Sequence, residues 1–76
     1  MFINTTIVTD AGSADVRIDS EQVIRQALVI LIESGKIPNI TIPDYFHSHL
    51  NSRPVSAYIT FAEEGINDGD ILTVIE

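Results

Sequence analysis

Residues 19–35 read DSEQVIRQALVILIESG, and this stretch predicts one amphipathic helix. Residues 21–34 contain neither glycine nor proline. The side chain of Asp19 can cap the first turn, and Gln22 at the third helical position completes the pattern of a capping box. Gly35 can take the left-handed conformation that ends a helix, and a proline three residues later prevents the helix from resuming.

The apolar side chains of this helix fall on two parts of its surface. Five of them gather into a stripe about 120° wide, which we expect to face the core: Val23, Ile24, Ala27, Ile30 and Leu31. Leu28 lies at the edge of the stripe, and Val29 and Ile32 lie on the polar side. A helix that is apolar this far round is either covered by other segments of its chain or carries a contact surface. Both interpretations stay open, and Leu28, Val29 and Ile32 form a first candidate protein-interaction patch, the helix patch.

Two strand patterns precede the helix. Residues 2–9 are rich in β-branched residues and place Ile3, Thr5 and Ile7 on one face. Residues 10–13 follow with the composition of a turn, in which glycine permits a positive φ. Apolar and charged residues then alternate as in a half-buried strand. We expect these two strands to form a hairpin.

The chain after the helix predicts two more strands. One lies within residues 40–50, which contain an extended apolar segment. Residues 53–55 can form only a short or edge strand, because Pro54 lacks a backbone donor for the sheet ladder.

A second capping-box pattern follows these strands. Thr60 and Glu63 predict a single helical turn that holds Phe61 inward. Residues 67–70 predict a turn, and residues 71–76 predict a final strand whose second and fourth side chains face inward.

The order strand, strand, helix, strand, short strand, strand is that of an α+β β-grasp fold (ββαββ) in a single domain, residues 1–76. We expect a mixed sheet of four to five strands with the helix packed across one face. Because the crossover must be right-handed, the final strand returns to the centre of the sheet, parallel to residues 3–7 and with Val74 close to Ile3. A ferredoxin-like fold would need a second full helix, which no later segment is long enough to form.

The residues also resemble a known family. Residues 60–72, TFAEEGINDGDIL, are similar to the segment before the last strand of ubiquitin, and residues 34–38, SGKIP, are similar to the exit of its helix. The chain thus resembles the ubiquitin-like superfamily. Within it, the GDIL ending, the extra apolar helix residues and the missing tail resemble the YukD/EsaB group of small bacterial proteins associated with type VII secretion. The resemblance implies a non-catalytic protein-interaction module, an accessory or regulatory component with secretion-system proteins as partners.

Composition excludes several classes of function. The 76 residues include no cysteine, which excludes disulfides, thiolate metal sites and thiol catalysis. Four basic against 11 acidic residues give a net charge of −7, which repels nucleic acid and anionic lipid. The longest apolar run, residues 27–32, is far shorter than the roughly 18–20 residues that cross a bilayer. No basic stretch precedes the first apolar residues, so we expect no signal peptide, no membrane insertion and a cytoplasmic location, and we predict no cofactor.

The resemblance places a second candidate patch on the exposed face of the sheet. Two positions of the patch by which ubiquitin is recognised fall on His49 and Ile75, with His47 and Thr73 as neighbours. Only Ile75 is aliphatic, which indicates partners other than ubiquitin receptors. His47 and His49 share a strand face, a spacing that could hold a metal or sense pH. Because no third ligand stands at a suitable spacing, we expect exposed histidines and no metal site.

Two other functions remain as alternatives. A sulfur carrier or protein modifier requires C-terminal glycines, and none follows Gly69, so this function would need processing or extension of a chain that ends at Glu76. A self-assembling protein would pair copies of the chain through the helix patch or the edge near Pro54. Catalysis is not expected, because capping and turns explain the acidic residues of 63–70 and no nucleophile stands in a catalytic motif.

Overall fold

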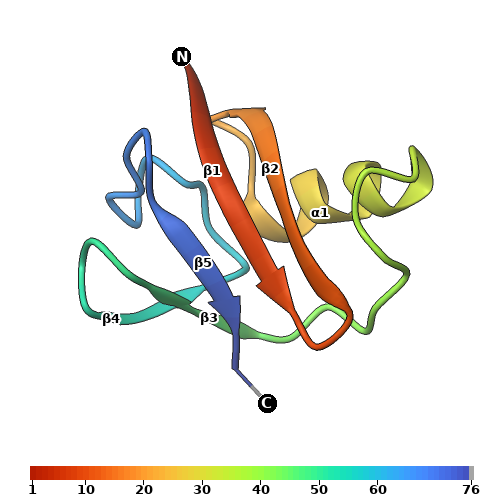
Figure 1. Cartoon of the computed structure of the whole chain (residues 1–76). Coiled ribbons are helices and arrows are strands. Elements are labelled where there is room, and N and C mark those ends of the chain that lie inside the picture. The colour runs from red at the N-terminus through yellow and green to blue at the C-terminus, as the bar shows by residue number, and fades with distance from the viewer. Residues whose placement is uncertain (76) are drawn as a thin grey trace.

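Five strands form one mixed sheet, and a single helix lies across one face of it (Figure 1). The computed structural model describes residues 1–75. The elements follow one another as β1 (Phe2–Thr9), β2 (Gly12–Asp19), α1 (Ile24–Glu33), β3 (Tyr45–Ser48), β4 (Arg53–Ser56) and β5 (Ile71–Val74). The strand order β2-β1-β5-β3-β4 confirms the predicted β-grasp arrangement. The predicted final strand also included Glu76, which lies outside the described residues.

The last strand lies in the centre of the sheet, as predicted, but its register differs. β5 runs parallel to β1 and sets Ile71 beside Thr6. Val74 lies three residues after this pair and Ile3 three residues before it, which separates them by about 20 Å along the strands. The prediction that Val74 lies close to Ile3 is therefore wrong. Sliding a strand by an even number of residues keeps the same face buried, so the apolar pattern alone does not select the register.

The core lies between α1 and the inner face of the sheet. Its buried apolar side chains come from every element and from the loops: Ile3, Ile7, Val16, Ile18, Ile24, Ala27, Leu28, Leu31, Ile37, Phe46, Val55, Ala57, Phe61, Ile66 and Leu72. The predicted inward faces of the hairpin strands are confirmed. Thr5 shares the buried face of β1, and its hydroxyl has no hydrogen-bond partner among residues 1–75.

The helix begins three residues later than predicted. The capping box at Asp19 does not form, and α1 starts at Ile24 without a side-chain cap. The Asp19 carboxylate instead accepts a hydrogen bond from the backbone N–H of Glu21 at 3.1 Å. This bond, more than any other contact, holds the pKa of Asp19 below its ordinary value.

Backbone pairing with a later segment replaces the missing cap. Val23 is extended and forms an isolated bridge with Thr60. The N–H groups of the first two helical residues donate to the carbonyl oxygens of Ile59 and Ala57 at 3.0 and 2.8 Å. These bonds satisfy donors that a helix start leaves unpaired, and they bind the helix to the segment after β4.

The buried stripe of α1 is rotated relative to the prediction. Ile24, Ala27 and Leu31 are buried as expected, but Leu28 is completely buried as well. Ile30, expected in the core, is 54% exposed. The side chains that meet the sheet therefore follow the spacing i, i+3, i+4, i+7 from Ile24. Because apolar residues cover most of this helix, periodicity allows either orientation, and packing on the sheet selects one.

The predicted end of the helix is confirmed. Gly35 has a φ of 78°, in the left-handed region. Its N–H donates to the carbonyl of Ile32 at 3.1 Å, and the N–H of Lys36 donates to that of Leu31 at 2.9 Å. This is the Schellman arrangement, which satisfies the last carbonyl groups of a helix. In the described part of the chain, no helix has both the length and the apolar character needed to cross a membrane.

The second predicted capping box forms. The Thr60 hydroxyl accepts a hydrogen bond from the N–H of Glu63 at 3.0 Å, and the Glu63 carboxylate accepts one from the N–H of Thr60 at 3.2 Å. Phe61, inside this turn, is completely buried, as predicted.

Side chains from three segments hold the long connection between α1 and β3. The guanidinium of Arg25 donates to the carbonyl oxygen of Ile42 at 3.2 Å and lies 5.8 Å from the ring centre of Tyr58. The Tyr58 hydroxyl donates to the carboxylate of Asp44. This hydrogen bond raises the pKa of Tyr58 above its ordinary value.

Tyr58 is expected to ionise above the ordinary tyrosine value of about 10, because its proton is held by a carboxylate. Since the folded-state pKa is raised, the stability from this bond is complete below the unfolded-state pKa and is lost as the pH rises through the folded-state value. Ultraviolet titration of a Tyr45→Phe variant, in which Tyr58 is the remaining tyrosine, measures this pKa. Adding Asp44→Asn should lower it, and an unchanged value would contradict the assigned cause.

Candidate functional site

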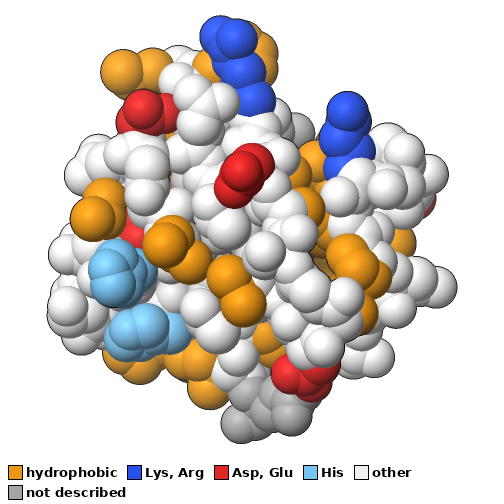
Figure 2. Space-filling model, viewed as in Figure 1, with side chains coloured by type: hydrophobic (Ala, Val, Ile, Leu, Met, Phe, Trp, Pro, Cys, Tyr) orange, Lys and Arg blue, Asp and Glu red, His pale blue; other side chains and the backbone are white. Residues whose placement is uncertain are grey.

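The sheet face opposite α1, here called the open face, carries the larger candidate surface. Cross-strand pairing sets Val8 of β1, Thr73 of β5, His47 of β3 and Pro54 of β4 in one row. The two histidines lie side by side on this face, with hydrophobic side chains around them (Figure 2). Four strands therefore contribute neighbouring side chains to a single surface.

An apolar hollow lies on the open face near the end of β5. Tyr45, Pro54 and Ile75 line this hollow, whose volume is about 290 Å³. The N–H of Ile75 donates to the carbonyl oxygen of Tyr45 at 3.4 Å, which places the two residues side by side. Tyr45 is 55% exposed and Ile75 is 36% exposed. Grouped aromatic and aliphatic side chains that remain exposed are typical of protein-binding surfaces.

The prediction of two exposed histidines is confirmed. His47 lies in β3 opposite Thr73, and Phe46 beside it faces the core. His49 follows β3, and its backbone N–H donates to the carbonyl oxygen of Ile71 at 3.0 Å. Both imidazoles lie at the surface. Within residues 1–75, no three His, Cys, Asp or Glu side chains are grouped closely enough to hold a metal ion.

The structure brings the four residues predicted for the sheet surface to one face: His47, His49, Thr73 and Ile75. Sequence reasoning missed Tyr45 and Pro54. Tyr45 carries a usable signal, since it stands two residues before His47 and must share its face. Pro54 carries no such signal, because only the β3–β4 register sets it opposite His47.

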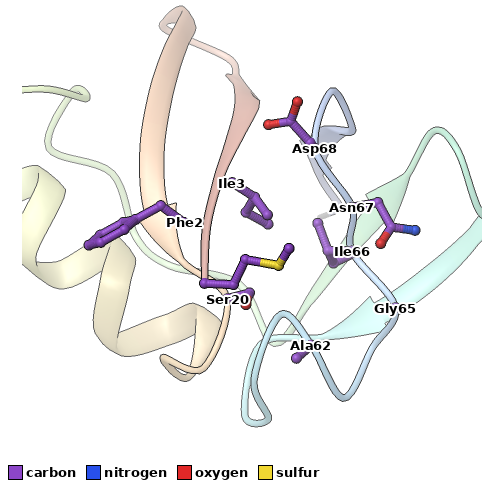
Figure 3. A pocket seen from close by; sticks show the side chains of 9 residues that line it. Phe2, Ile3, Ser20, Ala62, Gly65, Ile66, Asn67 and Asp68 are labelled. Atoms are coloured by element: carbon purple, nitrogen blue, oxygen red, sulfur yellow. The ribbon is translucent and has the colours of Figure 1, made fainter.

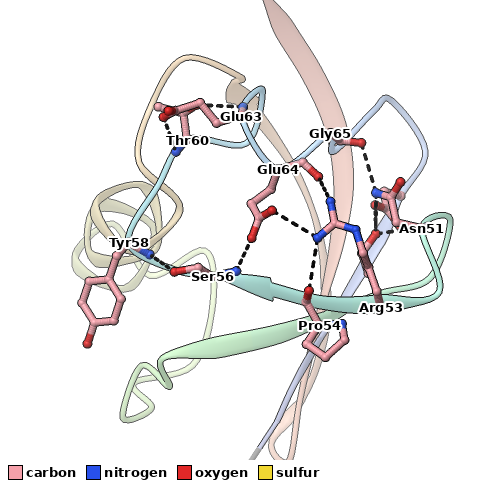
Figure 4. A network of polar contacts seen from close by, with 11 residues as sticks. Asn51, Arg53, Pro54, Ser56, Tyr58, Thr60, Glu63, Glu64 and Gly65 are labelled. Carbon is pink, nitrogen blue, oxygen red and sulfur yellow. Dashed lines mark hydrogen bonds and ion pairs between the residues drawn. The ribbon is translucent and has the colours of Figure 1, made fainter.

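A network of polar contacts fastens the edge strand β4, which carries Pro54, to the loop before β5 (Figure 4). The guanidinium of Arg53 donates to the Glu64 carboxylate at 3.1 Å and to the Glu64 carbonyl oxygen at 2.7 Å. The second carboxylate oxygen of Glu64 accepts a bond from the N–H of Ser56 at 2.5 Å. Glu64 thus pairs with a backbone N–H of the edge strand and holds in place the strand that carries Pro54.

A buried carboxylate joins β3 to the start of β5 behind the open face. Asp70 is completely buried. It accepts hydrogen bonds from the Ser48 hydroxyl at 2.5 Å, the N–H of Leu50 at 2.9 Å and the N–H of Ile71 at 2.7 Å. The turn predicted here forms, with the Asp70 N–H donating to the carbonyl oxygen of Asn67 at 3.1 Å. The turn alone does not account for Asp70, because its side chain is a polar part of the core.

The helix patch does not form as predicted. Leu28 belongs to the core, and its assignment to a surface patch is wrong, because the sheet packs against the side of α1 that carries it. Ile32 is half-buried and packs against the core. Val29 remains exposed, as does Ile30, but adjacent residues lie about 100° apart around a helix and do not form one face.

Comparison with known proteins establishes the fold. No protein-family model and no curated protein matches the chain. A designed protein based on ubiquitin has a similar structure, with a TM-score of 0.64 and 22% identity over 95% of this chain and 84% of that one. The EccD5 ubiquitin-like domain from Mycobacterium xenopi gives a TM-score of 0.51 and 15% identity over 100% of this chain and 97% of that one. The chain therefore has a ubiquitin-like β-grasp fold.

Proposed function

We propose that this protein is a non-catalytic, cytoplasmic protein-interaction module that serves a bacterial type VII secretion system as an accessory or regulatory component, in the manner of the YukD/EsaB group. The similarity of residues 60–72 to ubiquitin-like sequences supports this proposal. The similarity of the whole chain to an EccD5 ubiquitin-like domain hints at the link to secretion. We expect secretion-system proteins as partners.

The observation that carries the proposal is the apolar hollow on the open face. Tyr45, Pro54 and Ile75 expose apolar surface from three neighbouring segments. Phe46 and Val55, which follow Tyr45 and Pro54 in the chain, are completely buried and anchor their strands. A surface held in place before binding loses little conformational entropy when a partner covers it. We therefore assign partner binding to this hollow.

The polar border of the hollow suits recognition by a protein. His47 and Thr73 offer hydrogen-bonding groups beside the apolar side chains, and His49 lies farther along the same face, next to Ile71. An apolar centre with a polar rim is the common arrangement of protein interfaces. The hollow is open, whereas small-molecule sites enclose most of the surface of their ligand. The proposed role is therefore binding of a protein surface.

The Ile75→Asp variant is expected to recover about tenfold less secretion-system protein than the wild-type chain, because a charge in the hollow would be desolvated on binding. The tagged protein would be crosslinked in cells that contain a type VII system, and bound proteins would be quantified by mass spectrometry. Val29→Asp is the matched control, since it places the same charge on the exposed side of α1.

Circular dichroism of both variants would confirm that each remains folded. Equal recovery of secretion components by the wild-type chain and Ile75→Asp would contradict the proposed surface. Recovery of other proteins without any secretion component would contradict the proposed pathway.

A further inference from the structure

A second cavity lies where β1 begins, at the end of the sheet opposite the hollow. Its volume is about 640 Å³, and it lies between the start of β1, the end of β2 and the loop before β5 (Figure 3). Ile3 and Ile66 form an apolar floor, and both are buried. Polar groups of Ser20, Asn67 and Asp68 lie around this floor.

The hydroxyl of Ser20 is free to form a hydrogen bond at the cavity. Ser20 is 8% exposed, and its backbone is fixed by bonds of its N–H to Met1 and of its carbonyl oxygen to Ala62, both at 2.8 Å. Among residues 1–75, no group bonds to its hydroxyl, which lines the cavity. The hydroxyl can therefore accept a hydrogen bond from a ligand in the cavity.

The Asp68 carboxylate is held rigidly at the cavity. One of its oxygens accepts hydrogen bonds from the backbone N–H of Asn4 at 2.7 Å and from the Asn4 side-chain amide at 3.2 Å. The other oxygen accepts no hydrogen bond within the described part of the chain. The site therefore presents a positioned negative charge with an oxygen left for a cationic donor.

We propose that this cavity binds an arginine side chain of a protein partner. The stem of arginine is apolar and would lie on Ile3 and Ile66, while its guanidinium would donate to Asp68 and Ser20. The guanidinium spreads five donors over three nitrogens in a plane, so it spans acceptors that lie farther apart than the single nitrogen of a lysine ammonium does.

Charge supports this occupant over anionic or neutral ones. The side chains that line the cavity include the acidic Asp68 and no lysine, arginine or histidine, and the terminal ammonium of Met1, which also lines it, is paired with Asp19 at 3.2 Å. The chain as a whole carries a net charge of −7. An anionic group would be repelled by this overall charge, and a neutral group would gain no charge-assisted hydrogen bond from Asp68. This second site rests on the proposed function only in assuming that the partner is a protein.

The test uses N-acetyl-L-arginine amide as the probe and N-acetyl-L-citrulline amide as its neutral control. Each is titrated into the isotope-labelled full chain and followed by amide chemical shifts. The arginine probe should give saturable shifts at Ser20 and residues 66–68. The citrulline probe should bind at least about tenfold more weakly, because it lacks the charge-assisted hydrogen bond.

The Asp68→Asn variant should weaken arginine binding by about tenfold, while its side-chain oxygen can still accept from Asn4. Glu33→Gln removes the same charge from an exposed helix position and should leave binding unchanged. Ala62→Leu is a second variant, which tests the site even if Asp68→Asn disturbs the fold. It fills the cavity from an exposed rim position and should abolish the shifts. Absence of saturable shifts, equal binding of both probes, or full binding by the Asp68→Asn or Ala62→Leu variant would overturn the proposal.

These outcomes are separate from those for the hollow. The Ile75→Asp variant should bind the arginine probe as the wild-type chain does, because Ile75 lies at the other end of the sheet from the cavity. Loss of probe binding in this variant would contradict the claim that the hollow and the cavity are independent sites.

Discussion

The Asp70→Ala variant is expected to lose about 3–5 kcal/mol of the free energy of unfolding. The substitution removes the acceptor for the Ser48 hydroxyl and for the N–H groups of Leu50 and Ile71 in a completely buried site. A stability of roughly 0.05–0.15 kcal/mol per residue is normal for small domains, so the loss would be at least about a quarter of the total for this chain of 76 residues. Urea unfolding followed by circular dichroism measures the change.

Two further variants separate the hydrogen bonds from the general acidity of this loop. Asp70→Asn keeps one acceptor oxygen and should show a smaller loss than Asp70→Ala. Asp68→Asn changes an exposed neighbour and should cost less than about 1 kcal/mol. An Asp70→Ala protein as stable as the wild-type chain would contradict this assignment, because the three donors would then have found water or another acceptor at no cost in stability.

The Leu28→Ala variant is expected to lose about 2–5 kcal/mol, because it opens a cavity in the centre of the core. Ile30→Ala, two residues later on the exposed side of α1, should change the stability by less than about 0.5 kcal/mol. Both variants gain the high helix propensity of alanine, so the difference between them reports burial. Urea unfolding of the two proteins measures both losses, and similar m-values would show that the free energies of unfolding can be compared.

This pair of variants tests the orientation of the helix directly. Periodicity placed Ile30 in the core stripe and Leu28 at its edge, as part of the candidate helix patch, whereas in the structure Ile30 is exposed and Leu28 is completely buried. A larger loss for Ile30→Ala than for Leu28→Ala would restore the orientation predicted from periodicity and contradict the packing described here.

Features that depend on neighbouring residues were predictable. The Thr60–Glu63 capping box, the left-handed Gly35 and the faces of the hairpin strands agree with the sequence patterns. Each is set by interactions within a few residues, so local chemistry is sufficient to specify it. The element order then restricted the topology to a β-grasp sheet.

Features that depend on distant residues were not predictable in the same way. Asp19 and Gln22 form a valid capping pattern, yet Val23 pairs with Thr60 and moves the helix start. Pro54 reached the hollow on the open face through a strand register. Asp70 looked like a turn residue because its three hydrogen-bond donors do not appear as a local motif.

The amino-acid sequence by itself determined the elements, their order and the faces that the strands bury, because periodicity and capping act over a few residues. Only the tertiary structure decided the side of α1 that faces the sheet, the register of β5 and the residues that line the hollow and the cavity. These features depend on packing and hydrogen bonding between segments that are distant in the sequence, and a local pattern does not specify which of those segments will meet.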